Sequence, residues 1–125
     1  MRFSFGRKRF SDLNEQEVLA LAISSEEDDA RIYRGYAETL RAEFPGSAAV
    51  FDGMAIEEDA HRQRLIDLHL QRFGSVIPLI RREHVSGYYA RRPVWLIENL
   101  GLERIRTEAA AMERDAERFY LAAAA

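Results

Sequence analysis

The chain has 125 residues, no cysteine and a formal net charge of −3 at pH 7. This length suffices for one domain with one hydrophobic core. The absence of cysteine excludes disulfides, iron–sulfur clusters and thiolate zinc sites, so a metal must be bound by oxygen or by imidazole nitrogen. The slightly acidic balance argues against nucleic acid as a partner. We expect neither a signal peptide nor a membrane-spanning segment, and therefore a cytoplasmic location.

The pattern of apolar residues predicts an all-α fold, because helical spacing recurs along the chain and no strand-like alternation is present. Residues 1–12 are a basic and aromatic N-terminal tail, which we expect to be poorly ordered or to pack on the domain. The alternative is that this tail contacts a membrane surface through its arginines and phenylalanines. Residues 13–125 form the predicted domain.

Three long helices are predicted in this domain. They cover about residues 14–44, 47–73 and 102–125. Asn14 and Glu17 have the spacing of a capping box at the start of the first helix. Pro45 is expected to end that helix, because proline cannot continue a helix interior. Residues 76–101 are then a connection of mixed character, in which a short helix over residues 94–99 is predicted.

One glutamate of each predicted helix lies on the apolar stripe that faces the core. Successive residues turn by about 100° around a helix axis, and this rotation places Glu26, Glu58 and Glu113 among the apolar residues of their helices. The residues that follow Glu26, Glu27–Asp29, turn away from the core and are expected to form a solvated face. His61 lies one turn after Glu58 and therefore shares its face.

These inward side chains are a candidate metal site. A buried carboxylate without a partner is costly, and a divalent cation removes both that cost and the repulsion between neighbouring carboxylates. Glu58 and His61 are three residues apart on one helix and can therefore reach the same metal ion. The alternative is that Glu26 and Glu113 form buried ion pairs with arginines such as Arg31, an arrangement that rarely stabilises a fold.

An internal repeat adds two tyrosines to this pattern. Tyr33 follows Glu26, and Tyr120 follows Glu113, at the same interval of two helical turns within the similar segments EEDDARIY and ERDAERFY. Each tyrosine therefore lies on the face of its glutamate and would hydrogen-bond a ligand carboxylate, while the alternative is a core tyrosine. Two weaker candidate ligands are Glu27 and His69. For His69 the alternative is a histidine at the end of the bundle.

These features resemble the rubrerythrin-like branch of the ferritin-like superfamily. The resemblance rests on Glu26 with Tyr33, on Glu58-x-x-His61 and on Glu113 with Tyr120. It implies a ferritin-like helical bundle in which glutamates and histidines bind two iron ions. In such bundles a long crossover joins the second and third helices, and residues 76–101 would be that crossover.

Two segments, AISSEEDDARIYRGYAE and AIEEDAHRQRL, look like the amino-terminal domain of bacterial membrane-bound ferritins. In those proteins a rubrerythrin-like domain precedes a membrane domain of the vacuolar iron transporter type. The resemblance implies an iron-binding domain at the cytoplasmic face of the bacterial inner membrane, fused or docked to a membrane iron transporter. It also implies a role in iron export or detoxification and in peroxide tolerance.

One departure from the family pattern is the fourth helix, which would bear a second Glu-x-x-His. The pattern is still helical at Ala122–Ala125. We therefore expect either a piece of a longer protein or two chains that share helices. In both cases we expect association, as a homodimer, because a three-helix piece exposes an apolar stripe.

Iron, as a di-iron pair, is the expected cofactor, because mixed carboxylate and imidazole ligation suits a metal that cycles between two oxidation states. Manganese and zinc accept the same ligands. The hypothesis for activity is oxidation of ferrous iron by oxygen or peroxide. A module that binds, senses or delivers iron without turnover is the second hypothesis, and a purely structural dimerisation domain is the third. The third predicts that glutamine in place of Glu26 or Glu58 leaves or raises stability.

Overall fold

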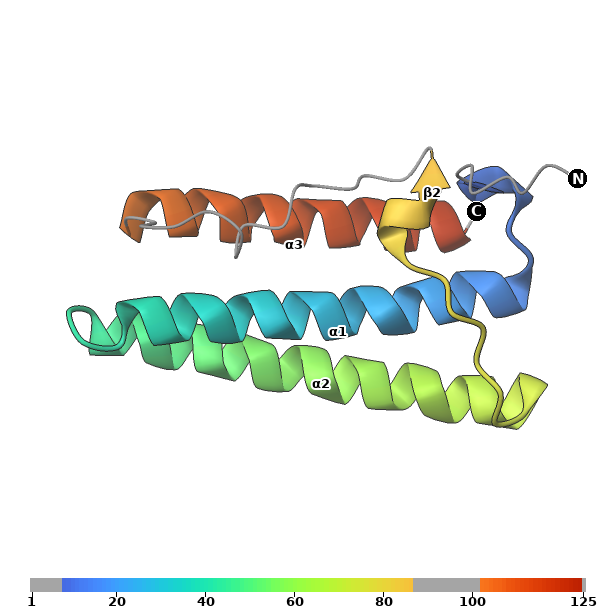
Figure 1. The fold of residues 1–125 in the computed structure, drawn as a ribbon, viewed down its shortest axis with the longest axis horizontal. Coiled ribbons are helices and arrows are strands. Elements are labelled where there is room, and N and C mark those ends of the chain that lie inside the picture. Colours follow the sequence, from blue (N-terminus) through green and yellow to red (C-terminus); the bar gives the residue numbers. More distant parts are fainter. Residues whose placement is uncertain (1–7, 87–101, 125) are drawn as a thin grey trace, which may run out of the picture.

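The computed structural model describes the backbone of residues 8–86 and 102–124 and, in the last helix, the side chains of residues 105–107 and 109–118. The predicted all-α fold is confirmed (Figure 1). The three long helices are α1 (Glu15–Leu40), α2 (Pro45–Phe73) and α3 (Leu102–Ala124). The short elements are η1 (Phe10–Asp12), η2 (Arg82–His84), β1 (Lys8–Arg9) and β2 (Val85–Ser86).

The start of α1 is fixed by the predicted capping box. The Asn14 side chain accepts a hydrogen bond from the Glu17 backbone N–H at 2.8 Å, and the Glu17 carboxylate accepts one from the Asn14 N–H at 3.1 Å. Both bonds satisfy backbone donors that have no partner within the helix. Lys8 Nζ lies 2.8 Å from the same Glu17 carboxylate. The residues before α1 are thus tied to its first turn.

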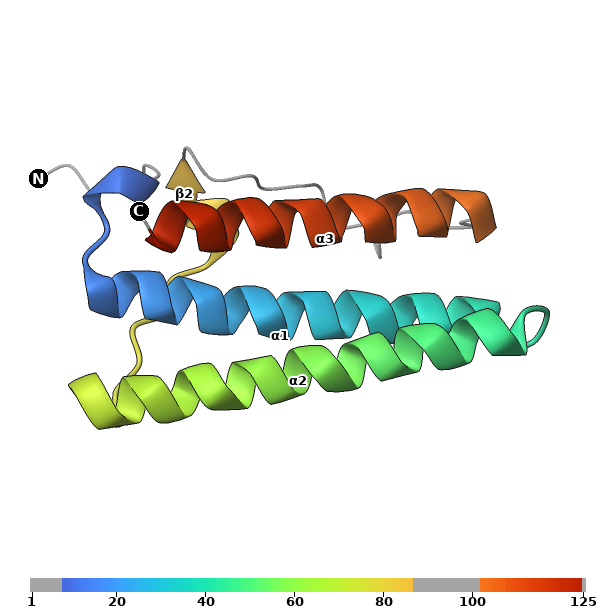
Figure 2. The same ribbon diagram turned by 180° about the vertical axis from the view of Figure 1, so that it is seen from behind.

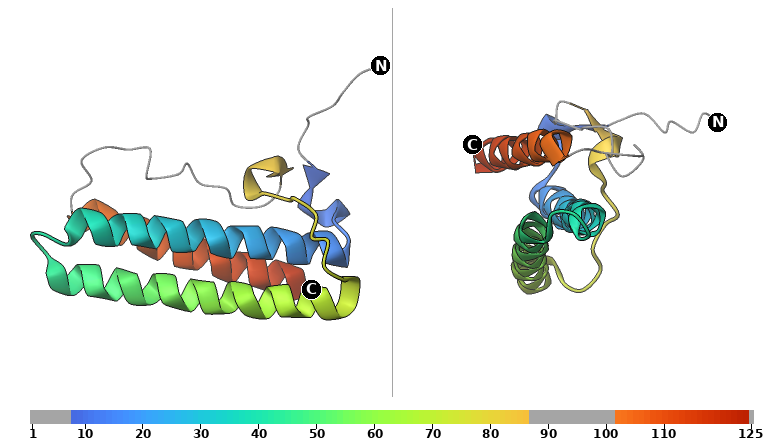
Figure 3. Two further views of the ribbon diagram at one scale, coloured as in Figure 1. Left: turned by 60° about the horizontal axis from the view of Figure 1, so that its bottom comes forward. Right: turned by 90° about the vertical axis from the view of Figure 1, so that its left-hand side faces the viewer.

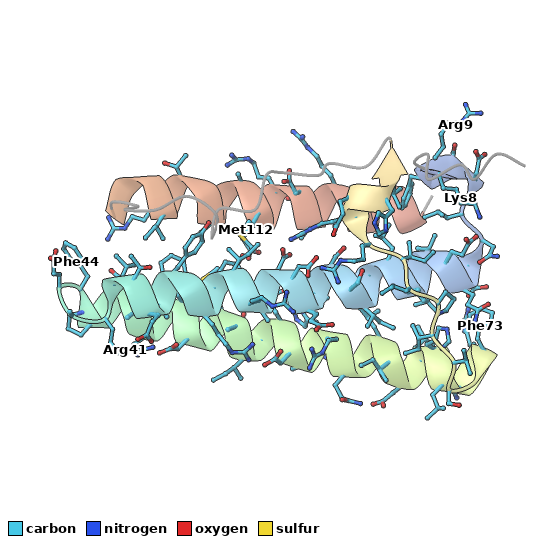
Figure 4. All side chains as sticks on the ribbon, in the orientation of Figure 1. Lys8, Arg9, Arg41, Phe44, Phe73 and Met112 are labelled. Atoms are coloured by element: carbon cyan, nitrogen blue, oxygen red, sulfur yellow. The ribbon has the colours of Figure 1, made fainter. Side chains whose placement is uncertain are left out.

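The turn between α1 and α2 corrects the predicted helix boundaries. α1 ends at Leu40 and not near Phe44, and the Phe44 N–H donates to the Leu40 carbonyl at 2.7 Å. Pro45 is the first residue of α2, which was predicted to begin near Ser47. Proline is favoured there because its missing N–H would have no partner in the first helical turn. The turn leaves Phe44 40 % exposed at one end of the bundle (Figure 4).

The main core lies where the three helices meet. α1 runs between α2 and α3 (Figure 3). Met112 projects from α3 toward α1 (Figure 4), and Ile105 and Ala109 are buried on the same stripe. They pack with side chains of α1 and α2 in one apolar cluster, and the larger members from those two helices are Ile32, Tyr33, Tyr36, Leu40 and Phe51. Where the side chains of α3 are described, the helix therefore packs through the predicted apolar stripe.

The first part of the crossover, residues 76–86, passes over α1, in front of it in Figure 1 and behind it in Figure 2. It ends in a minimal parallel pairing of β2 with β1, in register Lys8 with Val85 and Arg9 with Ser86. Ser24 in α1 donates a hydrogen bond to the Ile80 carbonyl at 2.5 Å. The predicted short helix over residues 94–99 lies outside the described residues.

Asp28 and Asp29 contradict the prediction of a solvated face. Asp28 is 2 % exposed and Asp29 is 7 % exposed, because the crossover covers this side of α1. Arg81 lies 2.6 Å from Asp28, and Arg82 lies 2.8 Å from Asp29. The two carboxylates are therefore buried as ion pairs. Among the described residues, no helix combines the length and the apolar character that crossing a membrane requires.

Candidate metal centre

A cluster of two carboxylates and one imidazole forms where α1 and α2 face each other. Glu26 comes from the middle of α1, and Glu58 and His61 come from consecutive turns of α2. His61 Nδ1 lies 3.7 Å from Glu26 Oε2 and 3.8 Å from Glu58 Oε1. One ligand atom of each residue lies within 4.8 Å of the other two. The helical hairpin thus brings together three of the four predicted ligands.

The fourth predicted ligand, Glu113, lies on the wall of the same cavity. This cavity has a volume of about 360 Å³. Its lining residues are Glu26, Glu58, His61, Glu113, Arg114, Ala116 and Glu117. Glu113 is exposed, whereas the prediction placed it inward among apolar residues. The reason is that α3 packs on α1 through Met112, so that the next residue is turned to the edge of the cavity.

The Glu58 carboxyl group is disposed to keep a proton when no cation is present. Burial, a hydrogen bond with Glu26 and the negative charge of Glu26 raise the pKa of Glu58 from 4.5 to about 10. A divalent cation in this position relieves the same repulsion without a proton. Two carboxylate groups and one imidazole nitrogen are a ligand set that iron, manganese and zinc accept. The residues present therefore fit a divalent metal ion.

Tyr33 connects this centre to α3. Its hydroxyl donates a hydrogen bond to Glu113 Oε1, although the two residues come from different helices. Burial, followed by the hydrogen bond and the charge of Glu113, raises the pKa of the Tyr33 phenol, which keeps it a hydrogen-bond donor. Its proposed partner in the internal repeat, Tyr120, has a side chain outside the described part of α3.

The two weaker candidate ligands lie apart from the cluster. Glu27 pairs with Arg31 at 3.4 Å on the surface of α1, so Arg31 is not confirmed as the partner suggested for Glu26. His69 is fully buried, and its Nδ1 lies 2.9 Å from the Gly74 carbonyl at the end of α2. Eight residues separate it from His61, which corresponds to about 12 Å along the helix. This position agrees with a histidine at the end of the bundle.

Arg114 and Glu117 line the cavity and were not identified from the sequence. Both follow Glu113 on the solvent side of α3, so their register alone indicates an ordinary surface. For Glu117 the available signal was its spacing of four residues from Glu113, which places both on one face of the helix. Arg114 is turned by about 100° from Glu113, so the sequence contained no such signal for it. Recognising them required the position of α3 relative to α2, which no local pattern contains.

In a comparison with known families, the model of the family described as Rubrerythrin matches residues 17–125. The match spans all three helices and includes every residue of the cluster. Proteins of this family typically bind iron at a carboxylate-rich site. No significant match was found among curated proteins or among solved structures. Because the family model covers most of the sequence and the cluster has the corresponding ligand types, the chain belongs to the rubrerythrin family.

Proposed function

We propose that the chain is an iron-binding domain, in which Glu26, Glu58 and His61 hold the metal and Glu113 completes its coordination. The observation that carries this proposal is the meeting of three ligand atoms from α1 and α2 within 4.8 Å of one another. The cavity beside them adds Glu113 within the same space. Family membership favours iron over manganese and zinc, which accept the same ligands.

The chain's own residues prepare the centre for a cation. The paired carboxylates of Glu26 and Glu58 supply negative charge, and the imidazole of His61 supplies a neutral nitrogen donor. Tyr33 holds Glu113 through its hydroxyl and so limits the directions in which that carboxylate points. Bound iron would supply redox chemistry, in which ferrous iron is oxidised by oxygen or peroxide.

Elemental analysis of protein purified without chelators tests the binding of iron. We expect about one or two iron atoms per chain or per dimer. We expect this iron to be lost in a Glu58→Ala/His61→Ala double variant that keeps its helical circular dichroism. The matched control is Glu57→Ala/Gln63→Ala, since both residues are exposed positions of the same helix. Wild-type protein that contains no metal and takes up no ferrous iron anaerobically would overturn the proposal.

Binding without turnover is the second candidate function. It is favoured by the number of close ligand atoms, since the described residues bring one Glu-x-x-His pair and one further carboxylate together, which suits one ion better than two. Stopped-flow mixing of anaerobic ferrous protein with oxygen or peroxide separates the two functions. Catalytic oxidation over several turnovers supports a ferroxidase, whereas binding without oxidation supports a module that senses or delivers iron.

We further propose that a second copy of the chain supplies the missing ligands, so that a di-iron centre forms in a homodimer. The resemblance to membrane-bound ferritins supports a place at the cytoplasmic face of a bacterial inner membrane, beside or fused to an iron transporter. In that place the domain would serve iron export and peroxide tolerance. Fractionation of cells with an antibody to this domain tests the location, because detection in the soluble fraction alone would contradict it.

A further inference from the structure

The crossover is bound to α1 by four charged side chains that are largely removed from water. Arg81 Nη2 lies 2.6 Å from Asp28 Oδ1, and Arg82 Nη1 lies 2.8 Å from Asp29 Oδ1. The side chains of Asp28 and Asp29 are 3 % and 10 % exposed, and that of Arg82 is 15 % exposed. Desolvation of such charges is costly, and buried ion pairs are weak sources of stability. The ion pairs are therefore better explained as contacts that fix the position of the crossover on α1 than as a source of stability.

The two aspartates project from α1 in directions that differ by about 100°. Asp29 follows Glu26 by three residues, a rotation of about 300° that returns it to the side of the metal ligand. Asp28 follows by two residues, a rotation of about 200° that turns it away. Glu26 is 4 % and Asp29 is 7 % exposed, so the two buried carboxylates occupy neighbouring positions, one helical turn apart, on α1. Arg82 thus holds a buried carboxylate that lies one helical turn from Glu26.

We propose that the Arg82–Asp29 ion pair makes the crossover a positioning element of the metal centre. The inference rests on the proposed function as a metal-binding domain. Arg82 fixes the direction of Asp29, and the pair fixes the turn of α1 from which Glu26 projects. Neither residue belongs to the close cluster of candidate ligands. They are positioning residues, and they connect the geometry of the centre to the docking of a segment more than fifty residues away along the chain.

The test compares Arg82→Gln with Arg81→Gln in the full chain. Arg81→Gln is the control, because it removes the contact of the same segment with Asp28 on the same helix and leaves the Arg82–Asp29 pair in place. Arg81 also pairs with Glu83, and Arg82 Nε also lies 3.8 Å from Asp28. Co²⁺, which accepts the same ligands and absorbs visible light, is the probe. We expect both variants to lower the unfolding temperature of the metal-free protein similarly. Only Arg82→Gln should weaken Co²⁺ binding, by about tenfold, and change the absorption spectrum. Arg82→Lys keeps the charge and should restore part of the affinity.

Each outcome decides the inference. Equal effects of Arg82→Gln and Arg81→Gln on Co²⁺ affinity, or no effect of either, overturn it and leave the proposed function standing. Tighter binding in Arg82→Gln also overturns it, because Asp29 would then act only as an additional negative charge. Wild-type protein that binds neither Co²⁺ nor Fe²⁺ overturns the proposed function and the inference together. If Arg82→Gln does not fold, Asp29→Asn takes its place with the same expected result.

Discussion

Tyr33 connects the aromatic core to the candidate metal centre. Its ring is 1 % exposed, and its centroid lies 6.1 Å from that of Phe51, to which it is stacked. Tyr36 lies edge-on to both rings. At its other end, the Tyr33 hydroxyl donates to Glu113 in α3. The ring is therefore held by packing on α1 and α2, so that its hydroxyl presents a fixed donor to a carboxylate of the cavity.

Replacing Tyr33 with phenylalanine separates these two roles. The ring packing is kept, so Tyr33→Phe should lower the free energy of unfolding by only about 1 kcal/mol. The loss of the bond to Glu113 should weaken Co²⁺ binding by about tenfold. Tyr36→Phe is the control, since it removes a hydroxyl from a neighbouring ring of the same aromatic packing and that hydroxyl has no bond to Glu113 in the structure. Equal Co²⁺ affinities of the two variants, measured by titration, would contradict a role for the Tyr33 hydroxyl in the centre.

Glu58 makes the stability of the metal-free protein depend on pH. Burial and the neighbouring Glu26 raise its pKa from 4.5 to about 10, so the folded chain keeps a proton that the unfolded chain has lost between these values. Its contribution to stability is therefore complete below about pH 4.5 and decreases as the pH rises toward about 10. We expect the free energy of unfolding to fall across this range, by at most about 1.4 kcal/mol per pH unit from this group. Denaturant titrations at several pH values measure the slope.

The variant Glu58→Gln is the control for this dependence, because glutamine stays neutral in both states. It should flatten the slope and stabilise the metal-free protein at neutral pH, while it abolishes Co²⁺ binding. In the wild type, binding of Co²⁺ requires the loss of the Glu58 proton, so its affinity should increase with pH. A slope that is the same in the wild type and in Glu58→Gln would show that another group titrates.

At the scale of the element, the end of α2 is joined to the start of α1 by His69. Its Nδ1 donates to the Gly74 carbonyl at 2.9 Å, and the Gln16 side-chain amide lies 3.4 Å from its Nε2. Gly74 has a φ of 88°, a conformation that glycine adopts without strain. Both nitrogens of the imidazole thus have polar partners, and these contacts connect α2 to α1 at this end of the hairpin.

His69→Leu should destabilise the protein by about 1–3 kcal/mol, because it leaves the Gly74 carbonyl and the Gln16 amide without their partner. We expect Co²⁺ affinity to remain unchanged, since His69 lies about 12 Å along α2 from His61. Thermal unfolding and Co²⁺ titration of the same variant measure both effects. A loss of affinity at retained helical content would instead make His69 an auxiliary ligand.

The limits of sequence-based prediction are visible in these elements. The start of α1 was predictable because Asn14 and Glu17 are close in sequence and bond to each other's backbone. The end of α1 was not, because Pro45 is compatible both with the end of one helix and with the first turn of the next. The burial of Asp28 and Asp29 depends on arginines 53 residues later in the chain. Helical periodicity contains no information on such long-range pairing.

At the scale of the whole molecule, part of the candidate centre could be predicted from local patterns, and part depends on long-range packing. The rotation around each helix placed Glu26, Glu58 and His61 on core faces, and the hairpin of α1 and α2 brings their ligand atoms together. The His61 side chain is nevertheless 46 % exposed, so its prediction as a residue of the core side was wrong. The exposure of Glu113 could not be predicted, because it depends on how α3 is rotated against α1 and on what covers the cavity. The grouping of the candidate ligands on the helical hairpin could thus be predicted from periodicity, whereas the open side of the candidate centre depends on how the helices assemble.

The proposed association of two copies would use this open side. Val50 is 62 % exposed on α2 and precedes His61 by eleven residues, about three helical turns, so it lies on the same side of the helix as that ligand. If a second copy completes the centre, metal binding and association are linked, and Co²⁺ should shift the protein from monomer to dimer. Analytical ultracentrifugation with and without Co²⁺ measures this shift.

Val50→Glu should keep the protein monomeric and weaken its Co²⁺ binding, because a charge on this face opposes the packing of a second helix. The matched control is Val76→Glu, since Val76 is 81 % exposed just beyond the end of α2. A dimer that forms equally with and without Co²⁺ would separate association from the metal centre. A Co²⁺ affinity that is the same in both variants would mean that one chain provides all ligands of the ion, so that the centre functions without a partner.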